Sequence, residues 1–224
     1  MKKHLLVLLV LFAILSPLTA DVVEIVDNPI FGQFLPHYKT LMTDAFKEAG
    51  HTLTFKSVPL ARGNEMLALG TIDGTLGGAD HLEEVPNLVS VDVPIHKSVY
   101  YPYVRKDVTI TGLGDFRGKT LAGLRGSDVF EVLKQNLGCN VIYLDSPEAI
   151  GKFVKSGRAD FFIHILGAGE AMIDAIDAHD IIGRVDAPFF STESYVLLQK
   201  EKSHVRDDLH PVLQRLAEEG AFNY

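Results

Sequence analysis

Apolar positions along the chain follow two periods, which predict strands and helices in alternation. Short runs of β-branched and apolar residues, "VVEIV" at 22–26 and "TLTFKSV" at 52–58, are typical of strands. The amphipathic stretch between them, from about Leu35 to Ala49, is closed by Gly50 and predicts a helix, as does "LARGNEMLALG" at 60–70. Strands joined by helices of this length favour right-handed crossovers and a mainly parallel sheet.

One arrangement occurs twice, about eighty-five residues apart. The segments "LGTIDGTLGGADH" at 69–81 and "KSGRADFFIHILG" at 155–167 both run from a helix end through Gly-x-x-Asp into an apolar strand. We interpret them as equivalent positions in two similarly built lobes.

The second half of the chain repeats the strand and helix alternation. "TLAGL" predicts a strand, Ser127 can cap a helix to about Leu137, and "NVIYLD" predicts the next strand. Ser146 followed by Pro147 marks another helix start before the strand "DFFIHI". Further predicted elements are one or two long strands within 87–107, a helix in 169–180, a strand in 189–200 and a final helix from about 205 to 219.

The first twenty residues have the order of a secretory signal peptide. Lys2 and Lys3 precede an apolar run from Leu5 to Leu15, and small residues lead to Ala20, after which we expect cleavage. The run is too short to span a bilayer, and no Cys follows it to carry a lipid anchor. These features predict an exported protein.

Charge and cysteine content exclude several function classes. Removing the two lysines and no acids moves the formal net charge from −8 to about −10, which disfavours nucleic acid and anionic membranes as partners. Cys139 is the single cysteine, so no internal disulfide forms, and its apolar neighbours indicate a packing role.

Four segments, in this order and spacing, resemble one known family. They are "GTIDGTLGG" at 70–78, "VDVPIHKS" at 91–98, "LGDFRGKTLAGLRGSD" at 113–128 and "IGKFVKSGRADFFI" at 150–163. They are similar to the family 3 extracellular solute-binding proteins, the amino-acid-type periplasmic receptors of ABC importers. The resemblance implies an α/β, type 2 periplasmic-binding-protein fold: two lobes, each a mainly parallel sheet flanked by helices, joined by two hinge strands around a ligand cleft. The expected division is 1–20 signal peptide, 21–104 plus 190–224 lobe 1, and 105–189 lobe 2.

The ligand clamp of the family is not matched. The family's carboxylate-binding Arg falls at about Val85, and its amine-binding acid falls at about Ile165. Because neither charged position of the clamp is matched, the sequence does not favour an ordinary α-amino acid as the ligand. We expect a small polar, anionic solute.

Ligands of open α/β sheets bind beyond the carboxyl ends of strands, so the residues that follow predicted strands are the candidates. The ligand-binding set is Asn28, Phe31, Arg62, Asp80, His81, Tyr101, Tyr103, Arg125, Ser127, Asp128, His164 and Glu193.

The turn from Arg125 to Asp128 is the best of these candidates. A Gly turn before a helix presents free backbone N–H groups to an anion, and Arg125 adds a bidentate cation. The family uses this turn for a ligand carboxylate. The alternative is that Ser127 or Asp128 only caps the helix and Arg125 points to water. Arg62, from the other lobe, can bridge the cleft with Arg125 or can pair with Glu65 at the surface.

The remaining candidates each have a structural alternative. Asp80 and His81 follow a Gly-Gly pair that lets backbone approach a ligand, or they form a polar turn. His164 is a ligand contact or a hydrogen-bonded core histidine, and no spacing supports a metal site with His81. The list closes with Tyr101 and Tyr103, which face one side of a strand and can stack on a ligand or pack in the core, and Glu193, a cleft acid or an exposed turn residue.

Two function classes remain. The first is a monomeric binding protein, without cofactor or metal, that serves an ABC transporter permease or a membrane sensor. The second is a lyase of the cyclohexadienyl dehydratase type, known in the family, for which His164, His81, Asp80 or Glu193 would have to act as acid or base. No hydrolase, P-loop, dinucleotide or zinc-protease motif is present in the sequence, and binding is favoured.

Overall fold

The structure is a computed structural model, and it describes residues 20–27, 36–78, 85–127 and 129–222. The first half contains β1 (Val22–Val26), α2 (Pro36–Glu48), β2 (Thr52–Lys56), α3 (Leu60–Ala68), β3 (Gly74–Gly78) and β4 (Leu88–Arg105). The second half contains η2 (Leu113–Phe116), β5 (Thr120–Leu124), α5 (Val129–Leu137), β6 (Asn140–Leu144), α6 (Pro147–Lys155), β7 (Phe161–Ile165), α7 (Leu166–Ala175), β8 (Ile182–Arg184), β9 (Phe190–Gln199), η3 (Lys200–Lys202) and α8 (Ser203–Glu218). The predicted alternation of strands and helices is confirmed, and the run at 87–107 forms one long strand.

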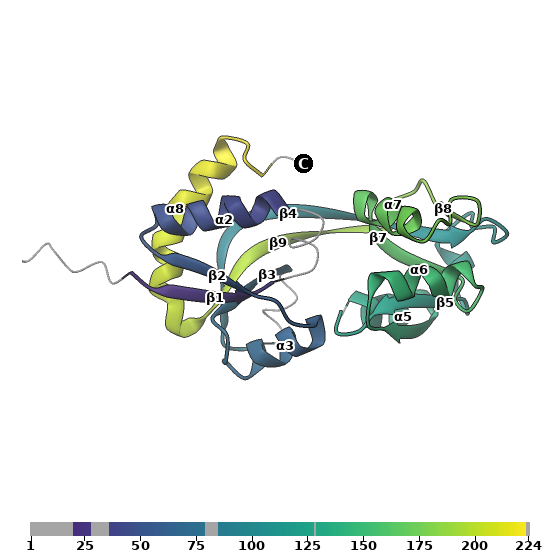
Figure 1. Ribbon diagram of the computed structural model, residues 1–224, viewed down its shortest axis with the longest axis horizontal. Coiled ribbons are helices and arrows are strands. Elements are labelled where there is room, and N and C mark those ends of the chain that lie inside the picture. The colour runs from purple at the N-terminus through teal and green to yellow at the C-terminus, as the bar shows by residue number, and fades with distance from the viewer. Residues whose placement is uncertain (1–19, 28–35, 79–84, 128, 223–224) are drawn as a thin grey trace, which may run out of the picture.

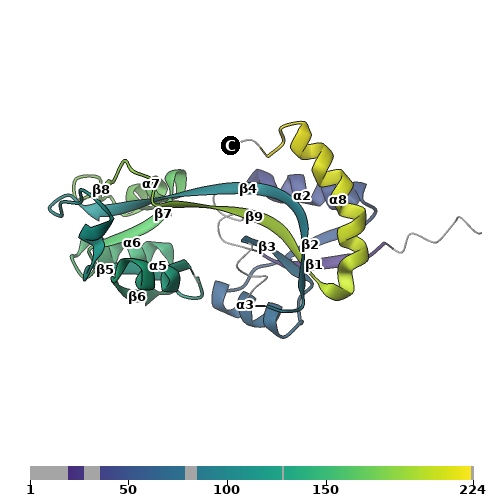
Figure 2. The ribbon, with the colours of Figure 1, turned by 180° about the vertical axis from the view of Figure 1, so that it is seen from behind.

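The elements form two lobes joined by two strands (Figure 1). The strands lie on one hydrogen-bonded path, β2-β1-β3-β9-β4-β7-β5-β6, with β8 paired to β4. Views from both sides show β4 and β9 running together from one lobe into the other (Figures 1 and 2). We call β4 and β9 the hinge strands. Because both are continuous through the two lobes, the boundaries expected near 104 and 190 stay a prediction.

The directions of the strands decide which ends face each other. β4 runs from lobe 1 into lobe 2, and β9 runs back antiparallel to it. β3 is antiparallel to β9 and parallel to β1, so both point toward lobe 2. β7 is antiparallel to β4 and parallel to β5, so both point toward lobe 1. The carboxyl ends of the parallel strands of both lobes therefore face the space between the lobes.

Lobe 1 has an apolar cluster on each face of its sheet. On the face covered by α2 and α8, Met42, Phe46 and Leu209 pack on Val23 and Val196 of the sheet. The opposite face carries α3, whose buried Met66 and Leu67 pack on Val26 and Leu197. Alternation along β9 sends even-numbered side chains toward α8 and odd-numbered ones toward α3.

Lobe 2 is built in the same way. Ile150 and Val154 of α6 and Met172 of α7 pack with Tyr103 and Phe162 on one face of its sheet. Phe130 and Leu133 of α5 cover the other face. Local signals fit these elements: Ser146 caps α6 by accepting a hydrogen bond from the Ala149 amide at 3.2 Å, as its sequence pattern predicts.

No helix in the described part of the chain is long and apolar enough to cross a membrane.

Candidate functional site

The two lobes touch directly where α3 meets the turn after β5. The Asn64 side-chain amide of α3 donates a hydrogen bond of 2.9 Å to the carbonyl oxygen of Gly126. Gly126 has a φ of +85°, and a Cβ placed on it would lie 2.6 Å from the backbone N and Cα of Ala61. Only glycine fits this position, because a side chain would be strained and would push the lobes apart. We call this the α3–turn contact.

The α3–turn contact brings the backbones of Arg62 and Arg125 near each other, since each residue is the sequence neighbour of a residue in the contact. Both side chains are 56% exposed. Arg62 pairs with Glu65 at 2.5 Å, and Arg125 donates to Asp145 at 2.8 Å and to the Tyr143 carbonyl at 3.2 Å. Exposed ion pairs of this kind are weak, so both guanidinium groups can exchange partners at little cost.

Ser127 lies next to the α3–turn contact and is half-buried. Its amide donates to the Leu124 carbonyl at 3.2 Å, which closes the turn after β5. Asp128 lies outside the described residues, so the choice between an anion site and a helix cap stays a prediction.

The hinge strands carry polar groups on the same side as α3. Glu193 and Tyr195 share the β9 face of Leu197, and Tyr195 packs partly against the apolar cluster beneath α3. The Tyr195 hydroxyl donates to Glu193 at 2.9 Å, and Lys97 of β4 lies opposite Glu193 in the ladder. Desolvation and the neighbouring Glu193 carboxylate raise the pKa of Tyr195, so this hydroxyl keeps its proton and remains a donor.

A carboxylate, that of Asp27, lies at the carboxyl end of β1, on the side of lobe 1 that faces lobe 2. Asp27 directly follows β1, its carboxylate is 16% exposed, and one oxygen accepts from Lys39 at 2.6 Å. The other oxygen, Oδ1, is buried and has no hydrogen-bond partner among the described residues. A buried carboxylate oxygen of this kind is costly unless a donor approaches it.

His164 lies on β7 opposite Tyr101 of β4. Burial lowers the pKa of His164 to about 4, so its ring is uncharged at neutral pH. Tyr101 is half-buried, and the Arg184 guanidinium lies 5.1 Å from its ring centre. The Nδ1 atom of His164 accepts a hydrogen bond of 2.9 Å from the Ile165 amide, so both side chains have contacts within lobe 2, which fits the structural alternative better than a ligand contact.

Tyr103 has a structural role. It is fully buried, stacks on Phe162 with ring centres 4.8 Å apart, and donates from its hydroxyl to the Leu166 carbonyl at 2.9 Å. Burial raises its pKa far above the ordinary range. The even spacing of Tyr101 and Tyr103 does place them on one side of β4, but that side faces the core beneath α7.

Five of the predicted site residues lie outside the described residues: Asn28, Phe31, Asp80, His81 and Asp128. The positions of the family's clamp are described, and both are apolar and buried: Val85 beneath α3 and Ile165 at the end of β7. Among the residues that the structure describes, no three His, Cys, Asp or Glu side chains gather as metal ligands.

Three residues of the candidate site, Asp27, Asn64 and Tyr195, are absent from the set predicted from the sequence, whereas Gly126 lies within the predicted turn at 125–128. Asp27 had a usable signal, because it is the first polar residue after a strand. Tyr195 shares the strand face of the chosen Glu193, so alternation would have found it. Asn64 and Gly126 lie 62 residues apart and show no pattern that connects them.

No family model and no curated protein matches the sequence. Solved structures do match over nearly the whole chain. A histidine kinase sensor domain with similarity to periplasmic binding proteins is 17% identical, with 92% of each chain covered and a TM-score of 0.72. An ancestral arginine-binding protein bound to glutamine is 19% identical, covering 90% of this chain and 94% of that one, with a TM-score of 0.72. An arginine transport-system periplasmic binding protein from Legionella pneumophila is 14% identical, covering 91% and 95%, with a TM-score of 0.70.

These likenesses establish the fold: the chain is two-lobed and of the periplasmic-binding-protein type. The expected α/β class with two hinge strands is confirmed.

Proposed function

We propose that the chain is a divergent member of the family 3 solute-binding proteins, which captures a small polar solute between its lobes. The observation that carries the proposal is that the carboxyl ends of the parallel strands of both lobes face each other, with the α3–turn contact between them. Ligands of such sheets bind at these ends. The partner would be an ABC importer or a membrane sensor, since the similar proteins include both kinds.

The charges around this region favour a solute with both signs. Arg62 and Arg125 contribute cations, one from each lobe, while Asp27 and Glu193 contribute carboxylates. The similar proteins include one bound to glutamine and one from an arginine transport system, and both of these solutes carry charges of both signs, which gives no support to the purely anionic solute expected from the sequence. We therefore propose an amino-acid-like zwitterion whose carboxylate meets the Arg125 guanidinium group and whose ammonium meets Asp27.

This assignment differs from the family's clamp. With Val85 and Ile165 apolar and buried, neither clamp position supplies a charge. The carboxylate and the ammonium group of the solute would instead be bound by Arg125, which follows β5, and by Asp27, which follows β1.

A thermal-shift screen of residues 21–224 against amino acids, dicarboxylates, polyamines, sugars and oxyanions tests the proposal, with calorimetry on each hit. Selective binding raises the unfolding temperature by an amount set by solute concentration over Kd. We expect an amino acid to bind, with affinity at least tenfold weaker in Arg125→Ala and in Asp27→Asn. The matched control is Arg206→Ala, which removes an exposed arginine of α8 that pairs with Asp207.

Two outcomes would overturn parts of the proposal. Binding of dicarboxylates alone, unaffected by Asp27→Asn, would restore the purely anionic solute. Turnover of a prephenate-like acid, without stable binding of any solute, would favour the lyase.

A further inference from the structure

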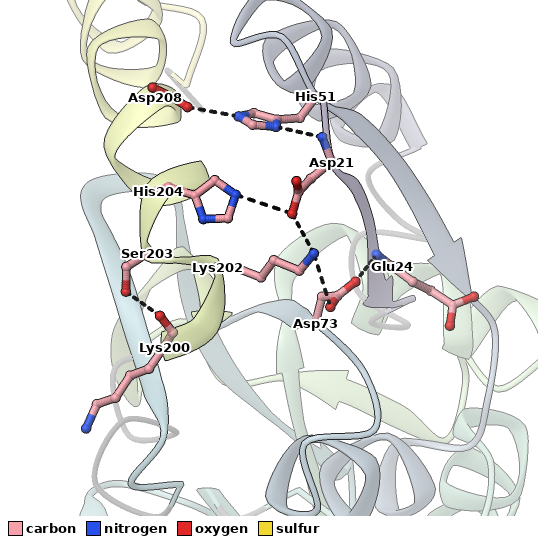
Figure 3. A network of polar contacts seen from close by, with 9 residues as sticks. All are labelled: Asp21, Glu24, His51, Asp73, Lys200, Lys202, Ser203, His204 and Asp208. Carbon is pink, nitrogen blue, oxygen red and sulfur yellow. Dashed lines mark hydrogen bonds and ion pairs between the residues drawn. The ribbon is translucent and has the colours of Figure 1, made fainter. Parts of the chain in front are cut away.

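The start of β1 is held by a polar network (Figure 3) and lies at the end of lobe 1 that is remote from lobe 2 (Figure 1). Every polar group of Asp21 except one carboxylate oxygen has a partner there. Its amide N donates to His51 Nδ1 at 3.3 Å, and its carbonyl accepts from the Thr52 amide at 2.8 Å. Its carboxylate binds Lys202 at 2.6 Å and His204 at 3.3 Å. The residue before it, Ala20, is exposed.

His51 connects Asp21 to α8. Its side chain is only 2% exposed, and its Nε2 lies 3.2 Å from the carboxylate of Asp208. Because Nδ1 accepts a hydrogen bond, the proton of the ring lies on Nε2 and faces Asp208. A stronger donor on the Nδ1 side would strengthen both hydrogen bonds, since linked hydrogen bonds polarise each other.

The described network is short of positive charge. It contains the carboxylates of Asp21, Asp73 and Asp208, and the ammonium group that lies beside the first two is that of Lys202, 2.6 Å from Asp21 and 3.9 Å from Asp73. Lys202 also lowers the pKa of Asp21, so this carboxylate is ionised at neutral pH. One more cation beside His51 would reduce the imbalance.

We propose that cleavage between Ala20 and Asp21 supplies this cation. Hydrolysis of that peptide bond adds one water, leaving a carboxylate on Ala20 and an α-ammonium group on Asp21. The nitrogen that now donates to His51 as an amide then donates as a charged group, and a charge-assisted hydrogen bond is about twice as strong as a neutral one. The mature amino terminus is thus a structural ion of lobe 1, and Asp21 is the residue at which the fold is built to begin. This inference does not depend on the proposed function.

Two proteins that differ by one residue test the inference. One starts at Asp21 and the other at Ala20, each released from a fusion by a protease that leaves no added residue. Both carry one α-ammonium group, but only in the first does it lie beside His51. We expect an unfolding temperature about 2 °C higher for the Asp21 start, from calorimetry at low salt. Equal unfolding temperatures would overturn the proposal.

A double-mutant cycle shows whether the effect acts through His51. In a His51→Leu background the difference between the two starts should vanish. Because His51 is buried, Asp208→Asn is a second variant at an exposed position, and there the difference should be reduced. An undiminished difference in both backgrounds would contradict the role of His51. Mass spectrometry of the exported full-length chain should find Asp21 at its start, and a different first residue would also overturn the proposal.

Discussion

Two tyrosines on the hinge strands have opposite roles although both are partly or fully buried. Tyr103 donates to a backbone carbonyl inside lobe 2, whereas Tyr195 donates to Glu193 on the face turned toward α3. Tyr103→Phe should therefore lower the free energy of unfolding by about 1 kcal/mol, as expected for one lost buried hydrogen bond, and leave solute affinity unchanged. Urea unfolding and calorimetry measure the two quantities.

Tyr195→Phe is the matched variant, and it should change affinity more than stability. If Tyr103→Phe weakens solute binding as strongly as Tyr195→Phe does, the division between core and site is wrong.

Two histidines whose pKa is lowered by burial, His96 and His164, make the free energy of unfolding depend on pH. His96 and His164 both have a pKa lowered to about 4, by burial in each case and also by the nearby His37 in the case of His96. Their unfolded-state pKa is about 6.5. Protonation therefore favours the unfolded chain. The contribution of these uncharged rings to the free energy of unfolding is complete above about pH 6.5 and is lost as the pH falls toward 4.

We expect each of these histidines to cost roughly 1 kcal/mol of stability at pH 5.5 relative to pH 7.5. Urea unfolding of His164→Gln at the two pH values should show a smaller loss than the unmodified chain. His210→Gln, in α8, is the control. An equal pH dependence in all three proteins would contradict the assignment of an uncharged buried ring.

Gly126 shows how one residue controls the approach of the lobes. In Gly126→Ala the new methyl would lie 2.6 Å from the Ala61 backbone, which cannot move away as a flexible side chain could. We expect solute affinity to fall at least tenfold, measured by calorimetry. Gly114→Ala is the matched control, because a Cβ there would meet nothing within 4 Å. Unchanged affinity in Gly126→Ala would mean that the solute does not need this contact.

At the scale of elements, α3 acts as a direct link between the lobes. Asn64→Ala removes its hydrogen bond to the Gly126 carbonyl, so the lobes of the solute-free chain should separate more often. Small-angle X-ray scattering should give a larger radius of gyration for this variant. Asn140→Ala is the control, because it removes a similar hydrogen bond, 3.3 Å to the Gly118 carbonyl, within lobe 2. Identical scattering from both variants would show that Asn64 does not hold the lobes together.

The elements could be predicted from the sequence because their signals are local. The hydrophobic period and the Gly and Ser-Pro signals mark α2, α3 and α6 close to their observed bounds. The links between elements have no local signal. The Asp21–Lys202 pair spans 181 residues and joins two charged side chains that look like ordinary surface residues in the sequence.

The site was predictable only in part for the same reason. The rule that ligands bind at strand ends selects the turn at Arg125, since it depends on strand direction alone, and a ligand contact at this turn stays a prediction. It could not separate Tyr103 from the site, because the side of β4 that Tyr103 faces is decided by the packing of α7.

At the scale of the whole molecule, capture of a solute between the lobes requires that both lobes contact it. The hinge strands carry Glu193 and Tyr195 between the lobes, and the strand ends of each lobe carry one charged pole, Asp27 in lobe 1 and Arg125 in lobe 2. If the hinge strands bend and the lobes close around a solute, the backbone amides near all four of these residues should exchange with solvent more slowly.

Hydrogen–deuterium exchange of residues 21–224, with and without the amino acid that binds best, tests this claim most directly. We expect slower exchange on binding in three segments at once: the turn at 125–127, the N-terminal half of α3, and β9 around Tyr195. Protection confined to one lobe, with the other unchanged at saturating solute, would contradict it.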